Sequence, residues 1–191
     1  MRLNQPRIPP LDQAEWTAEQ REVGEPTIRD GGVLNVFGTL IRHPKLFKRW
    51  MVFANHILYK SSLSPREREL LILRIGWLCR SGYEWTQHVR IGKASGLSNE
   101  EVVRISEGPD APGWSDFDAT LLRAVDELHA DAFMSDATWN ALGERYDQDQ
   151  LMDVVFTVGQ YQLVSTALNT FGVQLEEPLE EGLPFPGDAG R

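Results

Sequence analysis

Five segments of the chain carry the signature of a helix N-terminus, and this punctuation constrains the fold more than any other feature. In each, a Ser or Asp can cap the backbone N–H groups of the first turn, and the residue three positions later can cap in return. The segments are Ser64–Glu67, Ser81–Glu84, Ser98–Glu101, the looser Ser115–Asp118, and Asp147–Gln150. Apolar residues recur at intervals of three and four after these starts.

These signals predict helices over residues 65–79, 82–95, 99–107, 116–131, 136–145 and 148–171. Upstream, Pro44 suits the first position of a helix that reaches about Lys60, and residues 12–23 can form a short helix capped by Asp12. The β-branched run at 154–158 lies inside a segment with helical spacing, where burial overrides strand propensity. We therefore predict an all-α fold, a compact bundle of antiparallel helices.

The organisation along the chain indicates one helical domain with extended ends. A length of 191 residues fits a single domain with an ordinary core. Prolines keep the first residues extended, so residues 1–30 form an arm with a short helix. The helical domain spans residues 30–172. Residues 173–191 are acidic and rich in Pro and Gly, which is typical of a tail that is disordered or lies over a neighbouring subunit.

Charge and cysteine content narrow the function classes. The net charge of −9 argues against a nucleic-acid partner, because phosphate binding needs surplus Lys and Arg. With a single cysteine, Cys79, no internal disulfide can form. The N-terminus has no apolar segment typical of a signal peptide, and no apolar run is long enough to span a bilayer. These features predict a cytoplasmic protein that acts on a small molecule, without a membrane partner.

Glu84 and His88 are the residues that most directly indicate chemistry. Four residues apart on a helix, they lie on one face, where the carboxylate can orient the imidazole and favour its protonated form. That pairing is the minimum requirement for general acid–base catalysis. A structural alternative stays open, because Glu84 is also the capping partner expected for Ser81.

The segment from residue 64 to 96 resembles the carboxymuconolactone decarboxylase family, which shares its fold with the AhpD-like alkylhydroperoxidases. The matching text is LSPREREL at 63–70, LRIGW at 73–77, YEWTQH at 83–88 and ASGLS at 94–98. Weaker similarity extends the resemblance to about residues 30–172. It implies an AhpD-like compact helical bundle that is oligomeric, as a dimer, trimer or trimer-based hexamer.

The resemblance also indicates which branch of the fold this chain follows. The peroxidase branch carries a Glu, then Cys-x-x-Cys, then a His four residues after the second Cys. Here Glu69 and His88 match the Glu and the His, whereas Ser81 and Glu84 stand at the cysteine positions. Thiol cycling needs a thiolate and a resolving thiol, and Cys79 is alone and two residues out of register. The chain is therefore not predicted to be a Cys-x-x-Cys peroxidase.

The predicted catalytic residues are His88, Glu84, Glu69 and Tyr83. His88 would deliver or remove a proton, Glu84 or Glu69 would orient it and tune its pKa, and Tyr83 would bind an enolate oxygen. No cofactor is required. No metal site is predicted, because a catalytic zinc usually takes three protein ligands, and His88 and Glu84 supply two.

The predicted substrate-binding residues are Phe37, His56, Arg66 and Trp85. Phe37 belongs to an apolar segment that the resemblance places beside the pocket, and His56 lies on the preceding helix. The guanidinium of Arg66 matches a substrate carboxylate, although arginines on one helix more often form a solvated face or salt bridges. Trp85, next to the catalytic Glu84, is also a candidate for the core or an interface.

The leading functional hypothesis is a lyase or isomerase that works by acid–base chemistry on a small lactone or an activated carboxylate. Two alternatives stay open: a non-catalytic oligomeric scaffold or binding protein of the same fold, and a residual alkylhydroperoxidase-type activity through Cys79. A cavity that opens onto His88 and Glu84 would favour the enzyme over the scaffold.

Overall fold

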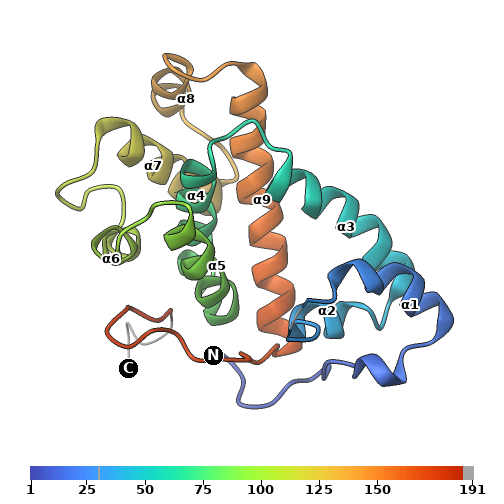
Figure 1. The fold of residues 1–191 in the computed structure, drawn as a ribbon. Helices are drawn as coiled ribbons and strands as arrows, with labels where there is room; N and C mark the ends of the chain where they lie inside the picture. Colours follow the sequence, from blue (N-terminus) through green and yellow to red (C-terminus); the bar gives the residue numbers. More distant parts are fainter. Residues whose placement is uncertain (30, 187–191) are drawn as a thin grey trace.

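The computed structural model describes residues 1–29 and 31–186, and within them the regular structure is helical (Figure 1). The helices are α1 (Ala18–Gly24), α2 (Asn35–Leu40), α3 (Pro44–Tyr59), α4 (Pro65–Leu78), α5 (Gly82–Ala94), α6 (Asn99–Glu107), α7 (Asp116–Asp131), α8 (Asp136–Gly143) and α9 (Gln148–Phe171), with short 3₁₀ turns at Gln13–Glu15 and Glu25–Thr27. The only β pairing in these residues is one isolated bridge between Arg29 and Gly32. The all-α prediction is confirmed.

The helix boundaries from residue 64 onward follow the sequence signals closely. Helices α4 to α9 begin at the predicted residues, and each ends within two residues of its predicted end. Ser98 and Asp147 form complete capping boxes with Glu101 and Gln150. Local capping chemistry therefore sets most of the helix starts.

The predicted helix over residues 12–23 is wrong in one respect, because the chain divides it. Asp12 caps only the 3₁₀ turn, and α1 begins after Thr17, which forms a capping box with Gln20. Between them Trp16 is extended, and its ring is buried against Ile41. Burial of this indole takes precedence over helix continuity.

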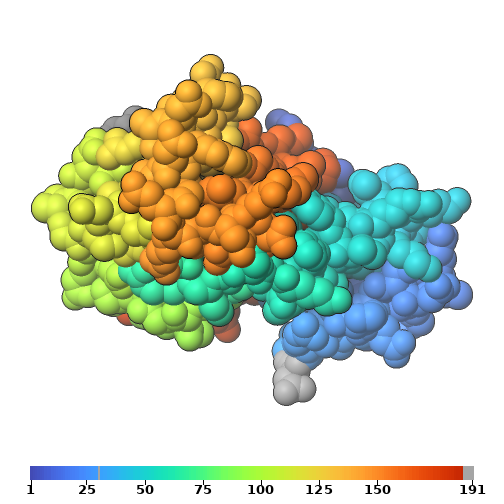
Figure 2. All heavy atoms as spheres, turned by 90° about the horizontal axis from the view of Figure 1, so that it is seen from above, coloured from blue at the N-terminus to red at the C-terminus, as the bar shows by residue number. Residues whose placement is uncertain are grey.

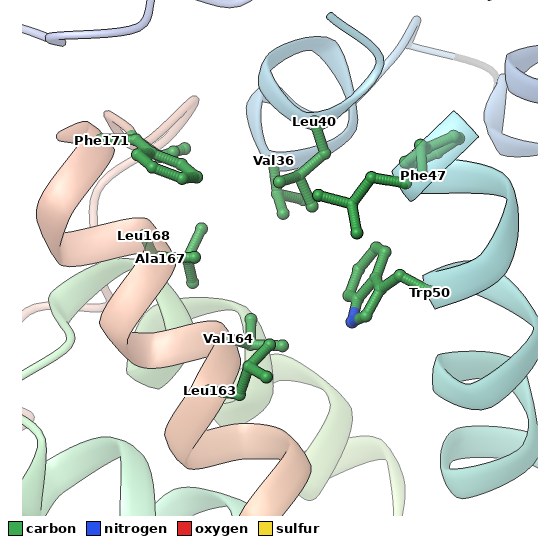
Figure 3. Close-up of a pocket in the computed structure, with 11 residues that line it drawn as sticks. Val36, Leu40, Phe47, Trp50, Leu163, Val164, Ala167, Leu168 and Phe171 are labelled. Atoms are coloured by element: carbon green, nitrogen blue, oxygen red, sulfur yellow. The ribbon is translucent and has the colours of Figure 1, made fainter. Parts of the chain in front are cut away.

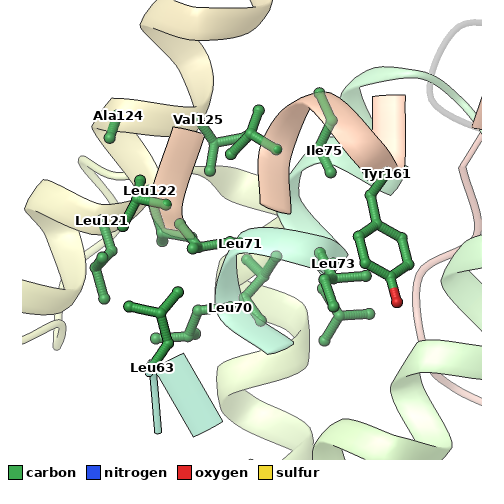
Figure 4. Close-up of a cluster of buried hydrophobic side chains, with 14 of the residues drawn as sticks. Leu63, Leu70, Leu71, Leu73, Ile75, Leu121, Leu122, Ala124, Val125 and Tyr161 are labelled. Atoms are coloured by element: carbon green, nitrogen blue, oxygen red, sulfur yellow. The ribbon is translucent and has the colours of Figure 1, made fainter. Parts of the chain in front are cut away.

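Helix α4 is the centre of the main core and packs against α5, α7 and α9. Every residue from 67 to 76 is buried, so this helix has no solvent-facing stripe. Figure 4 shows its apolar side chains meeting those of α7 beside α9. Glu69 is carried on this buried helix and is fully enclosed.

The N-terminal segments form a second body against the C-terminal half of α9 (Figure 1). Helices α1, α2 and α3 pack on one another, and α3 also contacts α9. The backbone N–H groups of Arg7 and Ile8 both donate to the carbonyl of Phe171, which fixes the extended arm to the end of α9. In Figure 2 this body lies on one side of α9 and helices α6 and α7 on the other.

The described part of the predicted tail, residues 173–186, lies against α5 of the same chain. Lys93 pairs with Glu180, and Arg90 pairs with Glu177. Residues 187–191 of the predicted tail, and Asp30 of the predicted turn, lie outside the described residues. Within the part of the chain that the structure describes, no helix combines the length and the apolarity needed to cross a membrane.

Candidate active site

The structure brings Glu69, Glu84 and His88 into one buried cluster at the contact of α4 and α5. His88 Nδ1 lies 2.7 Å from Glu69 Oε2, and His88 Nε2 lies 2.9 Å from Glu84 Oε1. All three side chains are less than 10% exposed. The imidazole is therefore held between two carboxylates, one from each helix, and each carboxylate faces a different ring nitrogen.

Two further residues hold Glu69 in position. Arg68 donates to Glu69 Oε1 through Nε and Nη2, both at 3.1 Å, so one carboxylate oxygen faces a guanidinium and the other faces the imidazole. Gly92 lets α5 approach α4 closely here, since a Cβ on it would lie 2.9 Å from Leu97 Cδ1. These contacts fix the Glu69 carboxylate against His88 without mobile solvent.

Glu84 is engaged by His88 and not by the helix cap that the sequence offered as the alternative. Ser81 makes no side-chain capping bond at the start of α5, and its buried Oγ has no partner among the described residues. The predicted Ser81–Glu84 capping box is therefore wrong. Glu84 Oε1 instead reaches one helical turn forward to His88, as expected for residues at i and i+4.

The two carboxylates make His88 an acid at neutral pH. Burial alone lowers the pKa of His88, but the neighbouring Glu69 and Glu84 outweigh burial and raise it to about 10. The ring is then an imidazolium that donates one N–H to each carboxylate. In this state the cluster holds a proton ready for transfer and does not act as a base.

A cavity of about 250 Å³ opens onto this cluster. Both Glu84 and His88 line it, whereas Glu69 does not. Most of its wall is apolar and comes from α2, α3, α5 and α9, with polar side chains from Asn55, Gln87 and Gln160. A mostly apolar cavity with a few converging polar groups is the usual form of a small-molecule site.

Tyr161 is a candidate that sequence reasoning did not single out. Its ring meets the His88 ring edge-to-face with centroids 4.9 Å apart, and it lines the cavity. Figure 4 shows its hydroxyl directed away from the leucines of the core. Burial, with Glu84 and Glu69 nearby, holds the pKa of Tyr161 well above its ordinary value, so the hydroxyl remains a donor. Only its place near the middle of α9, beside the helix α5 site, distinguishes it from other core tyrosines.

Tyr83 lines the same cavity, but its hydroxyl is already engaged. It donates to Glu176 Oε1 at 2.8 Å and accepts from the backbone N–H of Val36 at 3.3 Å. Glu176 also accepts from the side chain of Gln87 and the backbone of Asn35. The single hydroxyl proton is therefore used within the protein, and the predicted bond from Tyr83 to an enolate is not available in this arrangement.

Of the four predicted substrate-binding residues, only Phe37 lines this cavity. His56 is exposed and faces Asp153 in a separate surface groove. Arg66 forms ion pairs with Glu101 and Asp118. These placements correct the predictions for His56 and Arg66, whose side chains meet protein carboxylates.

Trp85 and Cys79 also lie outside the cavity wall. Trp85 is fully buried and packs against Trp77 at 5.0 Å, so it belongs to the main core. Cys79 is half-buried, and burial raises the pKa of its thiol to about 11. A thiol in that state is a poor nucleophile at neutral pH.

Among residues 1–29 and 31–186, no group of three or more His, Cys, Asp or Glu side chains has an arrangement that could hold a metal ion. The cluster itself explains this, because both nitrogens of His88 face carboxylates.

The geometry defines an all-helical protein with an AhpD-like fold. A structure from Ralstonia eutropha JMP134, an alkylhydroperoxidase AhpD core described as an uncharacterized peroxidase-related protein, superposes with a TM-score of 0.77 at 19% identity, covering 90% of this chain and 93% of that one. A peroxidase-related protein from Silicibacter sp. TM1040 gives 0.71 at 16% identity, with 91% of each chain covered. The debrominase Bmp8 with 2,3,4-tribromopyrrole gives 0.71 at 11% identity, covering 91% and 93%.

Residues 44–127 match the model of the carboxymuconolactone decarboxylase family, which confirms the family resemblance predicted from the sequence. The matched segment runs from the start of α3 into α7 and contains Glu69, Glu84 and His88. No curated protein sequence matches the chain.

Proposed function

We propose that this protein is a cofactor-independent lyase or isomerase that acts by proton transfer on a small lactone or an activated carboxylate. The observation that carries the proposal is the Glu69–His88–Glu84 cluster at the wall of a closed, mostly apolar cavity. Such a cavity excludes water, which strengthens electrostatic interactions at the reacting group. A pKa of His88 at about 10 supports a role as proton donor.

In the proposed decarboxylation, the bond between the substrate carbon and its carboxylate breaks and carbon dioxide leaves. The electron pair moves into the conjugated carbonyl and forms a dienolate. The imidazolium of His88 then supplies the proton to carbon, and solvent later restores it. Glu84 and His88 line the cavity and Glu69 does not, so the proton leaves on the Glu84 side, through Nε2 or through the Glu84 carboxyl group.

Tyr161 takes the oxyanion-binding role in this proposal, in place of Tyr83. Its hydroxyl has no hydrogen-bond partner among the described side chains and backbone groups, and its ring contacts His88. A neutral hydroxyl directed at the developing enolate oxygen stabilises the transition state more than the ground state.

The test is turnover of a panel of γ-carboxylated unsaturated lactones and β-keto acids, followed as released carbon dioxide and as deuterium taken up from heavy water. We expect His88→Gln to lower turnover by about 10²-fold or more. His56→Gln is the matched control, because His56 faces a different groove, and it should leave turnover unchanged. A folded His88→Gln variant with wild-type turnover would refute the assignment. A wild-type protein inert toward the whole panel would favour the scaffold alternative.

We further propose that the protein works as a cytoplasmic homo-oligomer. Apolar side chains of α3 and α9 are unusually exposed on one face, among them Val52 at 73% and Phe156 at 51%. Phe53 and Phe156 contact each other edge-to-face across the two helices, which lie together in Figure 2. A patch of this kind on a helical protein commonly marks an interface. Sedimentation velocity of wild-type protein and Phe156→Asp tests this, and a monomeric wild-type protein contradicts it.

A further inference from the structure

We propose that a second, apolar chamber beside the acid–base cavity binds the hydrocarbon part of the substrate, so that the substrate is an amphiphile with an alkyl or aryl group of about six or more carbons. The reactive end would lie at His88, so this inference rests on the proposed function for its chemistry. The chamber itself stands on separate observations.

The chamber has a volume of about 200 Å³ and lies between α2, α3 and α9 (Figure 3). All of its lining residues are apolar or aromatic. The only side-chain polar atom among them is the indole nitrogen of Trp50, which is itself buried. Since an ordered water needs two to four polar partners, this wall favours a hydrocarbon occupant over water.

The chamber and the acid–base cavity share part of their walls. Val36, Trp50 and Val164 line both, so one side of each residue faces the chamber and another faces the cavity that holds His88. A single ligand passing these three side chains would place an apolar group against Leu168 and a polar group beside the imidazolium. This continuity identifies the occupant as part of the substrate.

The size of the chamber sets the class of substrate. An apolar cavity of about 150 Å³ in another protein stays dry and binds benzene, so a chamber of about 200 Å³ accepts a six-carbon group or a somewhat larger one. A lactone that carries only carboxylates would leave this space empty and would forfeit its dispersion contacts. The chamber therefore favours an alkyl- or aryl-substituted substrate.

The rim of the chamber offers a rival occupant. Leu46 and Leu163 both line it and are 55% and 59% exposed, so a second copy of the chain could cover it. The inner wall argues for a small molecule, because Phe47, Val164 and Leu168 are buried within one protomer and form a recess rather than a flat face. The experiment separates the two.

The probes are straight-chain fatty acids from butanoate to dodecanoate, titrated into the full-length protein by calorimetry. We expect affinity to rise about fourfold for each added methylene until the chamber is filled, and then to level off. Ala167 lines the chamber but not the acid–base cavity, and Figure 3 shows it on α9 facing the space. In Ala167→Phe we expect the chain-length dependence to disappear and decanoate to bind at least tenfold more weakly.

Ala130→Phe is the matched control, since Ala130 is an exposed helix residue outside this lining, and it should bind like the wild type. His88→Gln should keep the full chain-length dependence even if it abolishes turnover, so failure of the proposed chemistry and failure of the chamber are distinguishable. The inference is overturned if wild-type affinity does not depend on chain length. It is also overturned if Ala167→Phe binds every acid normally, or if it dissociates an oligomer, because the occupant is then a second copy.

Discussion

Replacing Glu69 with Gln removes one of the two carboxylates that keep His88 charged, and we expect the pKa of His88 to fall. The side chain keeps its size, so packing on α4 changes little. Glu69 is fully buried and lies 2.7 Å from the ring, so its charge acts on His88 without solvent screening. The variant therefore isolates the electrostatic contribution of one carboxylate.

The magnitude follows from the wild-type values. A pKa of about 10 against an ordinary 6.5 corresponds to about 5 kcal/mol of additional proton binding in the folded state, at ~1.4 kcal/mol for each tenfold change. Because the folded pKa is raised, this contribution to stability is fully present below about pH 6.5 and is lost as the pH rises toward 10. Breaking a buried ion pair typically costs about 3–5 kcal/mol, which agrees in scale.

The assay is NMR titration of histidine-labelled protein from pH 5 to 10.5, with the His88 signal assigned by His88→Gln, combined with urea unfolding at each pH. In the wild type we expect the His88 ring to remain protonated through pH 8 and the free energy of unfolding to fall between pH 6.5 and 10. In Glu69→Gln the ring should lose its proton at lower pH, and this slope should be smaller.

Glu67→Gln is the matched control, because Glu67 is a buried carboxylate on the same helix that pairs with Arg145 and not with His88. It should lower stability without moving the His88 titration. The reasoning fails if His88 titrates near 6.5 in the wild type, or if Glu69→Gln and Glu67→Gln give the same His88 pKa.

Three further predictions follow from the capping, the thiol and the tail. Ser98→Ala should lower the free energy of unfolding by about 1 kcal/mol, whereas Ser81→Ala should cost less, since only Ser98 caps its helix; equal losses by urea unfolding would contradict this. The thiol of Cys79 should react slowly with iodoacetamide at pH 7 and faster as the pH approaches 11, and Cys79→Ser should leave any peroxide reduction unchanged; fast labelling at pH 7 would count against the raised pKa. In Gly82→Ala the new Cβ would lie 2.2 Å from the Phe185 ring, so limited proteolysis should cut the tail near Phe185 sooner than in the wild type; an unchanged digestion pattern would show that the ring adjusts in place.

The helices of the main core could be predicted from sequence because their starts depend on contacts only three residues long. Asp147 and Ser98 meet their capping partners within one turn, whatever the rest of the chain does. The 12–23 segment resisted this reasoning because its division depends on where Trp16 buries its ring, which is decided by residues 25 and more positions away.

The candidate site shows the same division between local and distant contacts. The i and i+4 spacing of Glu84 and His88 was visible, but the same Glu84 also fitted a cap, and only the fold shows that the imidazole takes its carboxylate. Which tyrosine presents a usable hydroxyl depends on Glu176, which lies 93 residues from Tyr83. Arg66 likewise meets Asp118 from 52 positions away, a pairing that no local pattern indicates.

The buried cluster has a charge balance that bears on the turnover of the proposed enzyme. With His88 protonated, the positive charges of Arg68 and His88 cancel the negative charges of Glu69 and Glu84, so an anionic substrate can enter without opposing a net negative site. Once the proton has passed to the product, the same four groups sum to one negative charge in a medium of low polarity. Such a state repels an anionic product and attracts a new proton, so product release and recovery of the acid are favoured by the same electrostatic imbalance.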